Sequence, residues 1–257
     1  MTTNERHVYG APCWVDLATS DLDRAIAFYG ELFGWEATDT GAAFGHYTNM
    51  TRDGHLVAAL SPKLDPSQPS PDMWTVYFAV PDVHDALRRA TEAGAQPLFE
   101  PIQIADAGSM AMVVDPVGAA FGLWQPGTHR GFALYQQLGA PCWFELLTRD
   151  LDGSVAFYRD LLGVEVAEMD TGPGGPPYRT LNVGGTQYAG IADITGRLPD
   201  TIPNYWSAYF VVQDTDDAVR LIVERGGMVI TPPENSPQGR WATVADPMNA
   251  VFVIIGG

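Results

Sequence analysis

The sequence is poor in basic residues, and in lysine and cysteine above all. Its 257 residues contain 14 Lys and Arg against 31 Asp and Glu, a formal net charge of −17. Nucleic acids and anionic membranes both attract basic surfaces, so neither is expected as a partner. The single lysine, Lys63, lies among prolines, which leaves no credible nucleophile for Schiff-base chemistry. Two cysteines, Cys13 and Cys142, are too few for a disulfide scaffold or a cysteine-rich zinc site.

Long apolar runs are also missing. The first ten residues, MTTNERHVYG, have no hydrophobic stretch of the signal-peptide kind, and no run approaches the length of a membrane-spanning helix. We therefore expect a reduced, cytoplasmic protein. There is no G-x-S-x-G elbow, no Walker loop and no G-x-G-x-x-G after a strand, so no cofactor is predicted. With 46% hydrophobic residues, the chain can still build a substantial core.

An internal duplication organises the chain. Residues 10–34 read GAPCWVDLATSDLDRAIAFYGELFG and residues 139–163 read GAPCWFELLTRDLDGSVAFYRDLLG, with 15 of 25 positions identical. The repeat continues with WTVYFAVPDVHDA (74–86) against WSAYFVVQDTDDA (206–218). It closes with VVDPVGAAFGL (113–123) against TVADPMNAVFVI (243–254). A repeat of this length indicates tandem copies of one folding unit.

Each half divides into two smaller units. Trp14–Ala18 alternates like a strand, Asp21 is a natural N-cap for an amphipathic helix, and Gly34 ends that helix. Three short strands are expected next, and the same order begins again near residues 73, 139 and 205. We predict an α+β fold with four βαβββ modules, in two domains covering residues 1–127 and 137–257. Because one chain already holds four modules, we expect a monomer.

These segments resemble the vicinal oxygen chelate superfamily, which contains glyoxalase I, extradiol dioxygenases and bleomycin-resistance proteins. The resemblance rests on residues 14–34 and 143–163 and on the D-P endings at Asp115 and Asp246. It implies two tandem glyoxalase-like domains whose mixed sheets curl into cups that hold a ligand and, in many members, a divalent metal.

The positions that resemblance assigns to the metal ligands hold unsuitable residues. Seven residues before each helix-capping Asp, where the family usually has His or Gln, the chain has Trp14, Thr75, Trp143 and Ser207. The usual Glu near the end of each domain is replaced by Gly122 and Val253. Divalent metals prefer imidazole or carboxylate ligands. We therefore expect that the usual metal site is lost, although displaced ligands such as Asp16 or Glu145 remain an alternative.

Alternation along the strands predicts which side chains face each cup. The predicted ligand-binding residues are Trp14, Tyr77, Trp124, Trp143 and Tyr209. Asp16 and Glu145 share the face of Trp14 and Trp143, where they are candidate general bases or anchors for a ligand amine. They are equally candidates for structural carboxylates bonded to Tyr77 and Tyr209. Among the five histidines, His46 is the one expected to line a cavity.

Three functions remain open at this point. The aromatic lining favours a protein that binds an aromatic or cationic small molecule. The second possibility is an enzyme, with metal-free acid–base chemistry on Asp16 or Glu145, or with metal-dependent lyase or dioxygenase chemistry through displaced ligands. The third is an interaction protein in which Trp14 and Trp143 fill the cups. A fold alone does not decide between them.

Overall fold

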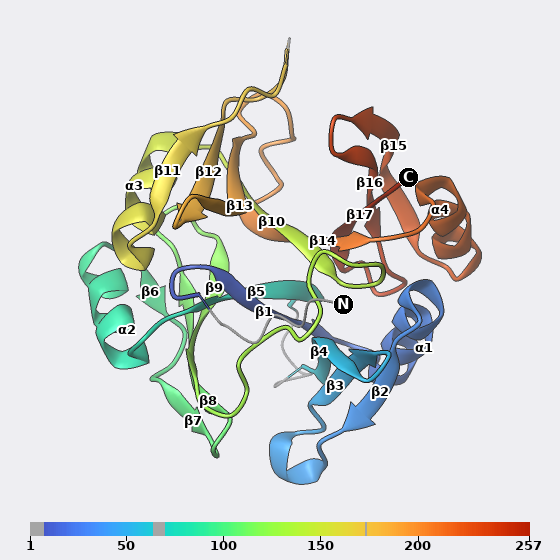
Figure 1. Ribbon diagram of the computed structural model, residues 1–257, viewed down its shortest axis with the longest axis horizontal. Helices are drawn as coiled ribbons and strands as arrows, with labels where there is room; N and C mark the ends of the chain where they lie inside the picture. The colour runs from blue at the N-terminus through green and yellow to red at the C-terminus, as the bar shows by residue number, and fades with distance from the viewer. Residues whose placement is uncertain (1–7, 64–69, 173) are drawn as a thin grey trace.

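The computed structural model describes residues 8–63, 70–172 and 174–257. The predicted order of one strand, one helix and further strands recurs four times, in two mixed sheets that each carry two helices (Figure 1). The first half contains β1 (Pro12–Thr19), α1 (Leu22–Phe33), β2 (Glu36–Asp39), β3 (Thr48–Arg52), β4 (His55–Pro62), β5 (Met73–Ala79), α2 (Val83–Glu92), β6 (Gln96–Pro97), β7 (Ile102–Ile104), β8 (Gly108–Val114) and β9 (Ala120–Pro126). The second half contains β10 (Pro141–Thr148), α3 (Leu151–Leu162), β11 (Glu165–Glu168), β12 (Tyr178–Val183), β13 (Thr186–Asp193), β14 (Tyr205–Val211), α4 (Thr215–Glu224), β15 (Met228–Ser236), β16 (Gly239–Ala245) and β17 (Val251–Gly256).

Both sheets have the same topology. The first runs β2-β3-β4-β1-β5-β9-β8-β6, with β7 also paired to β8, and the second runs β11-β12-β13-β10-β14-β17-β16-β15. The first strands of the two modules, β1 and β5, pair antiparallel at the centre, and β10 and β14 do the same. Each cup is therefore built across two modules. The short strand β7 and a 3-10 turn, η1 (Ala42–Phe44), are additions that the repeat pattern did not predict.

The helix ends follow the predicted local chemistry. The Asp21 carboxylate accepts from the backbone N–H of Arg24, and Asp150 accepts from Gly153 in the repeat. Such caps satisfy backbone donors that a helix leaves open in its first turn. At the other end of α1, Gly34 has φ +70°, a left-handed conformation that glycine adopts without strain.

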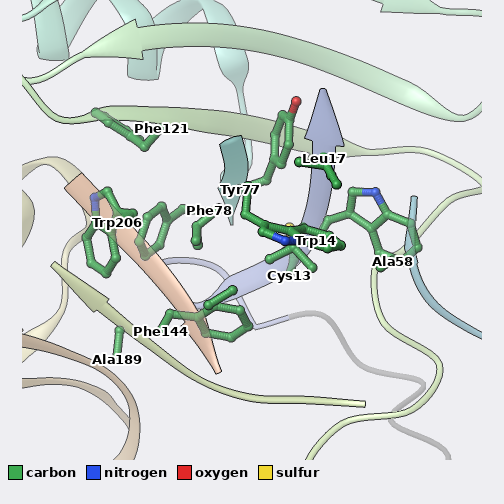
Figure 2. Close-up of a cluster of buried hydrophobic side chains, with 14 of the residues drawn as sticks. Cys13, Trp14, Leu17, Ala58, Tyr77, Phe78, Phe121, Phe144, Ala189 and Trp206 are labelled. Atoms are coloured by element: carbon green, nitrogen blue, oxygen red, sulfur yellow. The ribbon is translucent and has the colours of Figure 1, made fainter. Parts of the chain in front are cut away.

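The two halves pack back to back through one face of each sheet. Phe78 of β5 lies 5.0 Å from Trp206 of β14 between ring centroids, and Figure 2 shows these two side chains beside each other. In a second contact between the halves, Phe33 of α1 lies 5.1 Å from Phe210 of β14 between ring centroids. Neighbouring residues of a strand point to opposite faces, so Tyr77 and Tyr209 point away from this interface. The cups therefore open on the outer face of each sheet.

Each half sends one tyrosine into the other. The Tyr29 hydroxyl of α1 donates to Asp246 Oδ2 at 3.0 Å, and the Tyr158 hydroxyl of α3 donates to Asp115 Oδ2 at 2.8 Å. A tryptophan indole donates to each of these hydroxyls in turn. In Figure 1 the pairing appears as α1 beside α4 and α2 beside α3. We define these two linked sites as the tyrosine exchange.

Each aspartate of the tyrosine exchange also organises its own turn. Asp115 Oδ1 accepts from the backbone N–H groups of Val117 and Ala119, and Asp246 Oδ1 accepts from those of Met248 and Ala250. Burial raises the pKa of both carboxyls. The D-P endings that carried the family resemblance thus join the two halves as well as closing each sheet.

Replacing Tyr158 by Phe should destabilise the whole chain. The change removes the hydrogen bond to Asp115 and the one from the Trp206 indole without altering the ring, and leaving a buried polar group without its partner costs about 1–3 kcal/mol. Urea unfolding followed by tryptophan fluorescence should show this loss. Tyr188→Phe is the control, because the described part of the chain gives its hydroxyl no side-chain hydrogen bond, and its stability should stay within about 0.5 kcal/mol. A Tyr158→Phe protein as stable as wild type would contradict the assigned role.

Candidate ligand-binding site

The floor of the first cup is formed by the three central strands of its sheet. In the β1–β5 ladder Trp14 lies opposite Tyr77 and Asp16 opposite Thr75, while in the β5–β9 ladder Tyr77 lies beside Gly122. These positions alternate on one face, as the sequence pattern predicts. The structure thus brings Trp14, Asp16, Tyr77 and Trp124 around a single cavity of about 780 Å³.

Three segments form the walls of this cavity. The turn after β2 contributes Thr40, Ala43 and Phe44, and the segment around β7 contributes residues 103–107. The third wall is the segment 128–131, which follows β9 and leads towards the second half. The cup of the first half is therefore not filled by Trp14, contrary to the interpretation in which the tryptophans close both cups.

A hydrogen-bond chain runs across the cavity floor. The Trp14 indole donates to the Tyr47 hydroxyl at 2.8 Å, and Tyr47 donates to Asp16 Oδ2 at 3.1 Å. Tyr77 hydrogen-bonds to the same carboxylate. Burial nevertheless raises the pKa of Asp16 to about 6, because desolvation outweighs the two phenol donors. Asp16 is thus a carboxyl that changes charge close to neutral pH.

The second half repeats this chain of contacts. Trp143 donates to the Tyr178 hydroxyl at 2.9 Å, and Tyr209 donates to Glu145 Oε2 at 2.7 Å. Burial raises the pKa of Glu145 above its usual range. Both candidate carboxylates therefore have the tyrosine partners expected of a structural role, and the same geometry leaves them on the cup face.

Tyr47 and Tyr178 complete both networks and were not among the predicted site residues. The duplication could have indicated these two tyrosines, because His46 aligns with Pro177 and the next position is tyrosine in both halves. The two cups nevertheless differ in enclosure. Trp14 and Tyr77 are buried, at 4% and 6% exposure, whereas Trp143 and Tyr209 are half-buried.

The prediction for His46 was wrong. Its side chain is exposed on the turn before β3, and its Nδ1 lies 2.9 Å from Asp39 Oδ2. The histidine that lines the cavity is His129, in the segment between the halves. Its ring meets Trp14 edge-on, with centroids 4.4 Å apart, and the Trp124 indole donates to its carbonyl at 3.0 Å. His129 has no counterpart in the repeat, which is why the duplication did not reveal it.

The positions that resemblance assigns to a metal hold side chains of other chemistry. Thr75 and Trp14 offer no carboxylate or imidazole, and a side chain at Gly122 would overlap the Tyr77 ring. Over residues 8–63, 70–172 and 174–257, no three His, Cys, Asp or Glu side chains form a group suited to a metal ion. The side chains at the positions that resemblance assigns to metal ligands do not fit the usual metal-ligand set.

Lys63 forms an ion pair with Asp72, with its Nζ 2.5 Å from Oδ1.

Replacing Asp16 by Asn should change how stability depends on pH. The pKa of Asp16 is raised from 3.8 to about 6 on folding, so the neutral carboxyl favours the folded state. This contribution is complete below about pH 4 and is lost as the pH rises to about 6. Asp16→Asn should therefore melt with a weaker pH dependence across that range, and no lower than wild type at pH 8.

Asp106 provides the control for this melting experiment. It lines the same cavity but is exposed. Asp106→Asn, which removes an exposed carboxylate from the same cavity, is the reference with which the Asp16→Asn slope is compared. The groups facing the Asp16 carboxyl, Tyr47 and Tyr77, both have pKa values raised well above 10 and stay neutral throughout. Identical slopes in wild type and Asp16→Asn would show that Asp16 does not titrate in this window.

Comparison with known proteins places both halves in one family. The model of the Glyoxalase/Bleomycin resistance protein/Dioxygenase superfamily matches residues 12–123 and 142–254. The chain is 36% identical to "Putative glyoxylase CFP32" of Mycobacterium tuberculosis over 260 residues, covering 99% of this chain and 98% of that protein. It is also 36% identical over 265 residues to the anthracycline biosynthesis protein DnrV of Streptomyces peucetius, covering 97% of this chain and 94% of the relative.

Solved structures agree on the fold. The Mn(II)-bound glyoxalase from Novosphingobium aromaticivorans superposes with a TM-score of 0.66 at 15% identity, over 96% of this chain and 82% of that one. The 2,3-dioxygenase LapB from Pseudomonas sp. KL28 gives 0.64 at 14% identity, over 98% and 93%. None of the described helices is both long and apolar enough to cross a bilayer.

Proposed function

Because the chain belongs to the Glyoxalase/Bleomycin resistance protein/Dioxygenase superfamily, we propose that it binds an aromatic or cationic small molecule in the cavity of its first half. The observation that carries this proposal is the aromatic cavity of about 780 Å³ above a half-buried carboxylate, Asp16. Its volume lies within the range of sites for small organic ligands, roughly 300–1,000 Å³.

The cavity walls suit a flat ligand. Trp14 and Trp124 both make edge contacts with His129, with ring centroids 4.4 Å and 5.5 Å from its imidazole. Aromatic side chains bind planar molecules through stacking and edge contacts. The relatives named for anthracycline biosynthesis support a polycyclic aromatic compound as the class of ligand.

Asp16 suits a ligand that also carries a positive charge or a hydrogen-bond donor. Its carboxylate accepts from Tyr47 and Tyr77, and a carboxylate has about four acceptor positions, so acceptor capacity remains. The net charge of −17 favours the approach of cations over anions. An amine that pairs with Asp16 would also favour the ionised carboxyl.

The usual metal of the superfamily has no place in this proposal. Trp14, Thr75 and Gly122 stand where resemblance puts its ligands, and the Tyr77 ring takes the space that a side chain at position 122 would need. Asp16 alone is a poor site for a divalent ion, which prefers several oxygen or nitrogen ligands.

A metal-free enzyme is the second candidate function. The observation that favours it is the pKa of Asp16, raised to about 6, because a general base works best when its pKa lies near the working pH. The relatives named as glyoxylases agree with an enzymatic role. In this case Asp16 would take a proton from the bound ligand, and Tyr47 and Tyr77 would hold the carboxyl in place.

Titration with an anthracycline that carries an amino sugar tests the binding function. Quenching of tryptophan fluorescence should give a saturable Kd for wild type. Asp16→Asn should weaken binding about tenfold, since a hydrogen bond to a charged group contributes roughly 1.5–3 kcal/mol. Wild-type affinity should also fall as the pH drops below about 6 and Asp16 becomes protonated.

Glu145→Gln is the matched control, because it makes the same chemical change in the other half. It should leave the Kd unchanged if the ligand occupies the first cup. Equal binding by all three proteins would show that neither carboxylate contacts the ligand. Recovery of the anthracycline unchanged supports binding alone, whereas conversion that Asp16→Asn abolishes would establish the enzyme instead.

Metal analysis tests the proposal that the chain does not hold the usual metal of the superfamily. Protein purified without chelator should contain much less than one equivalent of Fe, Mn, Ni or Zn. Added Mn²⁺ should leave the melting temperature unchanged, since a metal that binds the folded state would raise it. One equivalent of tightly held metal, lost in Asp16→Asn, would contradict the proposal and point to a site with displaced ligands.

A further inference from the structure

The segment that joins the two halves is part of the first cup. The Phe132 ring packs on the Trp14 ring, with centroids 5.6 Å apart. It also stacks on Phe144 of β10, with centroids 5.7 Å apart. The Phe132 backbone N–H donates to the Cys13 carbonyl at 2.9 Å, and those of Ala133 and Leu134 both donate to Leu56. The backbone around His129 is thereby fixed to the first half, and the Phe132 ring contacts the second, so the imidazole has a defined position in the cavity.

Most hydrogen-bond donors around the cavity are already used within the protein. The indole N–H of Trp14 goes to Tyr47, and that of Trp124 goes to the His129 carbonyl. The hydroxyls of Tyr47 and Tyr77 are bonded to Asp16. The Gln103 amide goes to the carbonyls of Ala105 and Gly108. What faces the ligand from the floor is therefore mainly acceptor oxygen and aromatic surface.

The His129 imidazole is the exception. Within the described chain its ring nitrogens have no hydrogen-bond partner, and the ring contacts both Trp14 and Trp124. A neutral imidazole carries one N–H donor and one acceptor nitrogen. We infer that His129 is a specificity-determining residue, which donates its ring N–H to a carbonyl oxygen of the ligand. The cup would then select aromatic ketones or quinones over the corresponding hydrocarbons.

The protonation state of His129 agrees with this role. Burial lowers the pKa of the imidazole to about 4, so the ring is neutral at physiological pH. A neutral N–H donor can pair with an uncharged carbonyl without burying a second charge. Two other donors line the cavity, the Asn49 amide and the exposed Arg130 guanidinium. Neither is in ring contact with both tryptophans, as His129 is.

The inference rests on the proposed aromatic-binding function, and a pair of matched ligands separates the two. The probes are 9-fluorenone and fluorene, tricyclic molecules that differ at one carbon by a carbonyl. Wild type and His129→Phe are titrated with both by tryptophan fluorescence. Phenylalanine keeps an aromatic ring in contact with the tryptophans but has no donor.

His129→Phe should lose about fivefold in affinity for 9-fluorenone, the amount that one neutral hydrogen bond commonly contributes. Its affinity for fluorene should stay within about twofold, because the aromatic contacts remain. The ratio of the two affinities should therefore fall about fivefold between wild type and variant. Asn49→Ala and the surface variant His84→Ala should keep the wild-type ratio.

Each outcome decides a different claim. An unchanged ratio in His129→Phe, with both probes still bound, would overturn the role of His129 and leave the aromatic site intact. A ratio that falls in Asn49→Ala instead would place the donor on β3 and equally overturn the inference. If neither probe binds wild type at its solubility limit, the aromatic-binding function fails and the inference fails with it. Preserved melting temperatures show that the variants are folded.

Discussion

The tyrosine exchange is the constraint from which the rest of the architecture follows. Tyr29 and Tyr158 are both fully buried, and each reaches a carboxylate that belongs to the other half. A phenol in such a place needs an acceptor, and a buried carboxylate needs donors, so neither half satisfies these groups alone. Because each half supplies both a tyrosine and an aspartate, the halves are held in a reciprocal arrangement about the β5–β14 contact.

This arrangement determines which face of each sheet is free. The even-numbered side chains of β5 and β14, such as Phe78 and Trp206, are committed to the interface. The odd-numbered ones, such as Tyr77 and Tyr209, then face outward and form the cup floors. A single strand thus serves two surfaces that cannot be changed independently, since a shift in register by one residue would exchange interface and floor.

Local chemistry made the elements and much of the floor predictable from the sequence. Asp21 and Gly34 bound α1 because capping and left-handed conformations depend on a few neighbouring atoms. Strand alternation placed Trp14 and Asp16 on one face for the same reason. The roles assigned to the floor residues remain predictions, since geometry shows where they lie and not what they bind.

The walls could not be predicted in this way. Tyr47 reaches Asp16 only through the pairing of β3 with β4 and of β4 with β1, and a strand pattern does not give that order. His46 alternates suitably in the sequence, but a turn with φ +59° at that residue carries it out to Asp39. His129 lies in a segment without periodicity or repeat. Its position depends on backbone contacts with two distant strands, which become visible only in three dimensions.

Duplication produced two similar floors, and the walls then made them different. Trp–Tyr–carboxylate chains occur in both halves, with Asp16 replaced by the longer Glu145 and Trp124 by Ile255. Only the first floor is covered by the segment between the halves, whose His129 and Phe132 pack on Trp14. Burial raises the pKa of both Asp16 and Glu145. The added wall gives the first floor further enclosure, and low local polarity strengthens the hydrogen bonds that a ligand makes there. The same ancestral floor can therefore be more enclosed in one half than in the other, because enclosure depends on residues that the repeat does not contain.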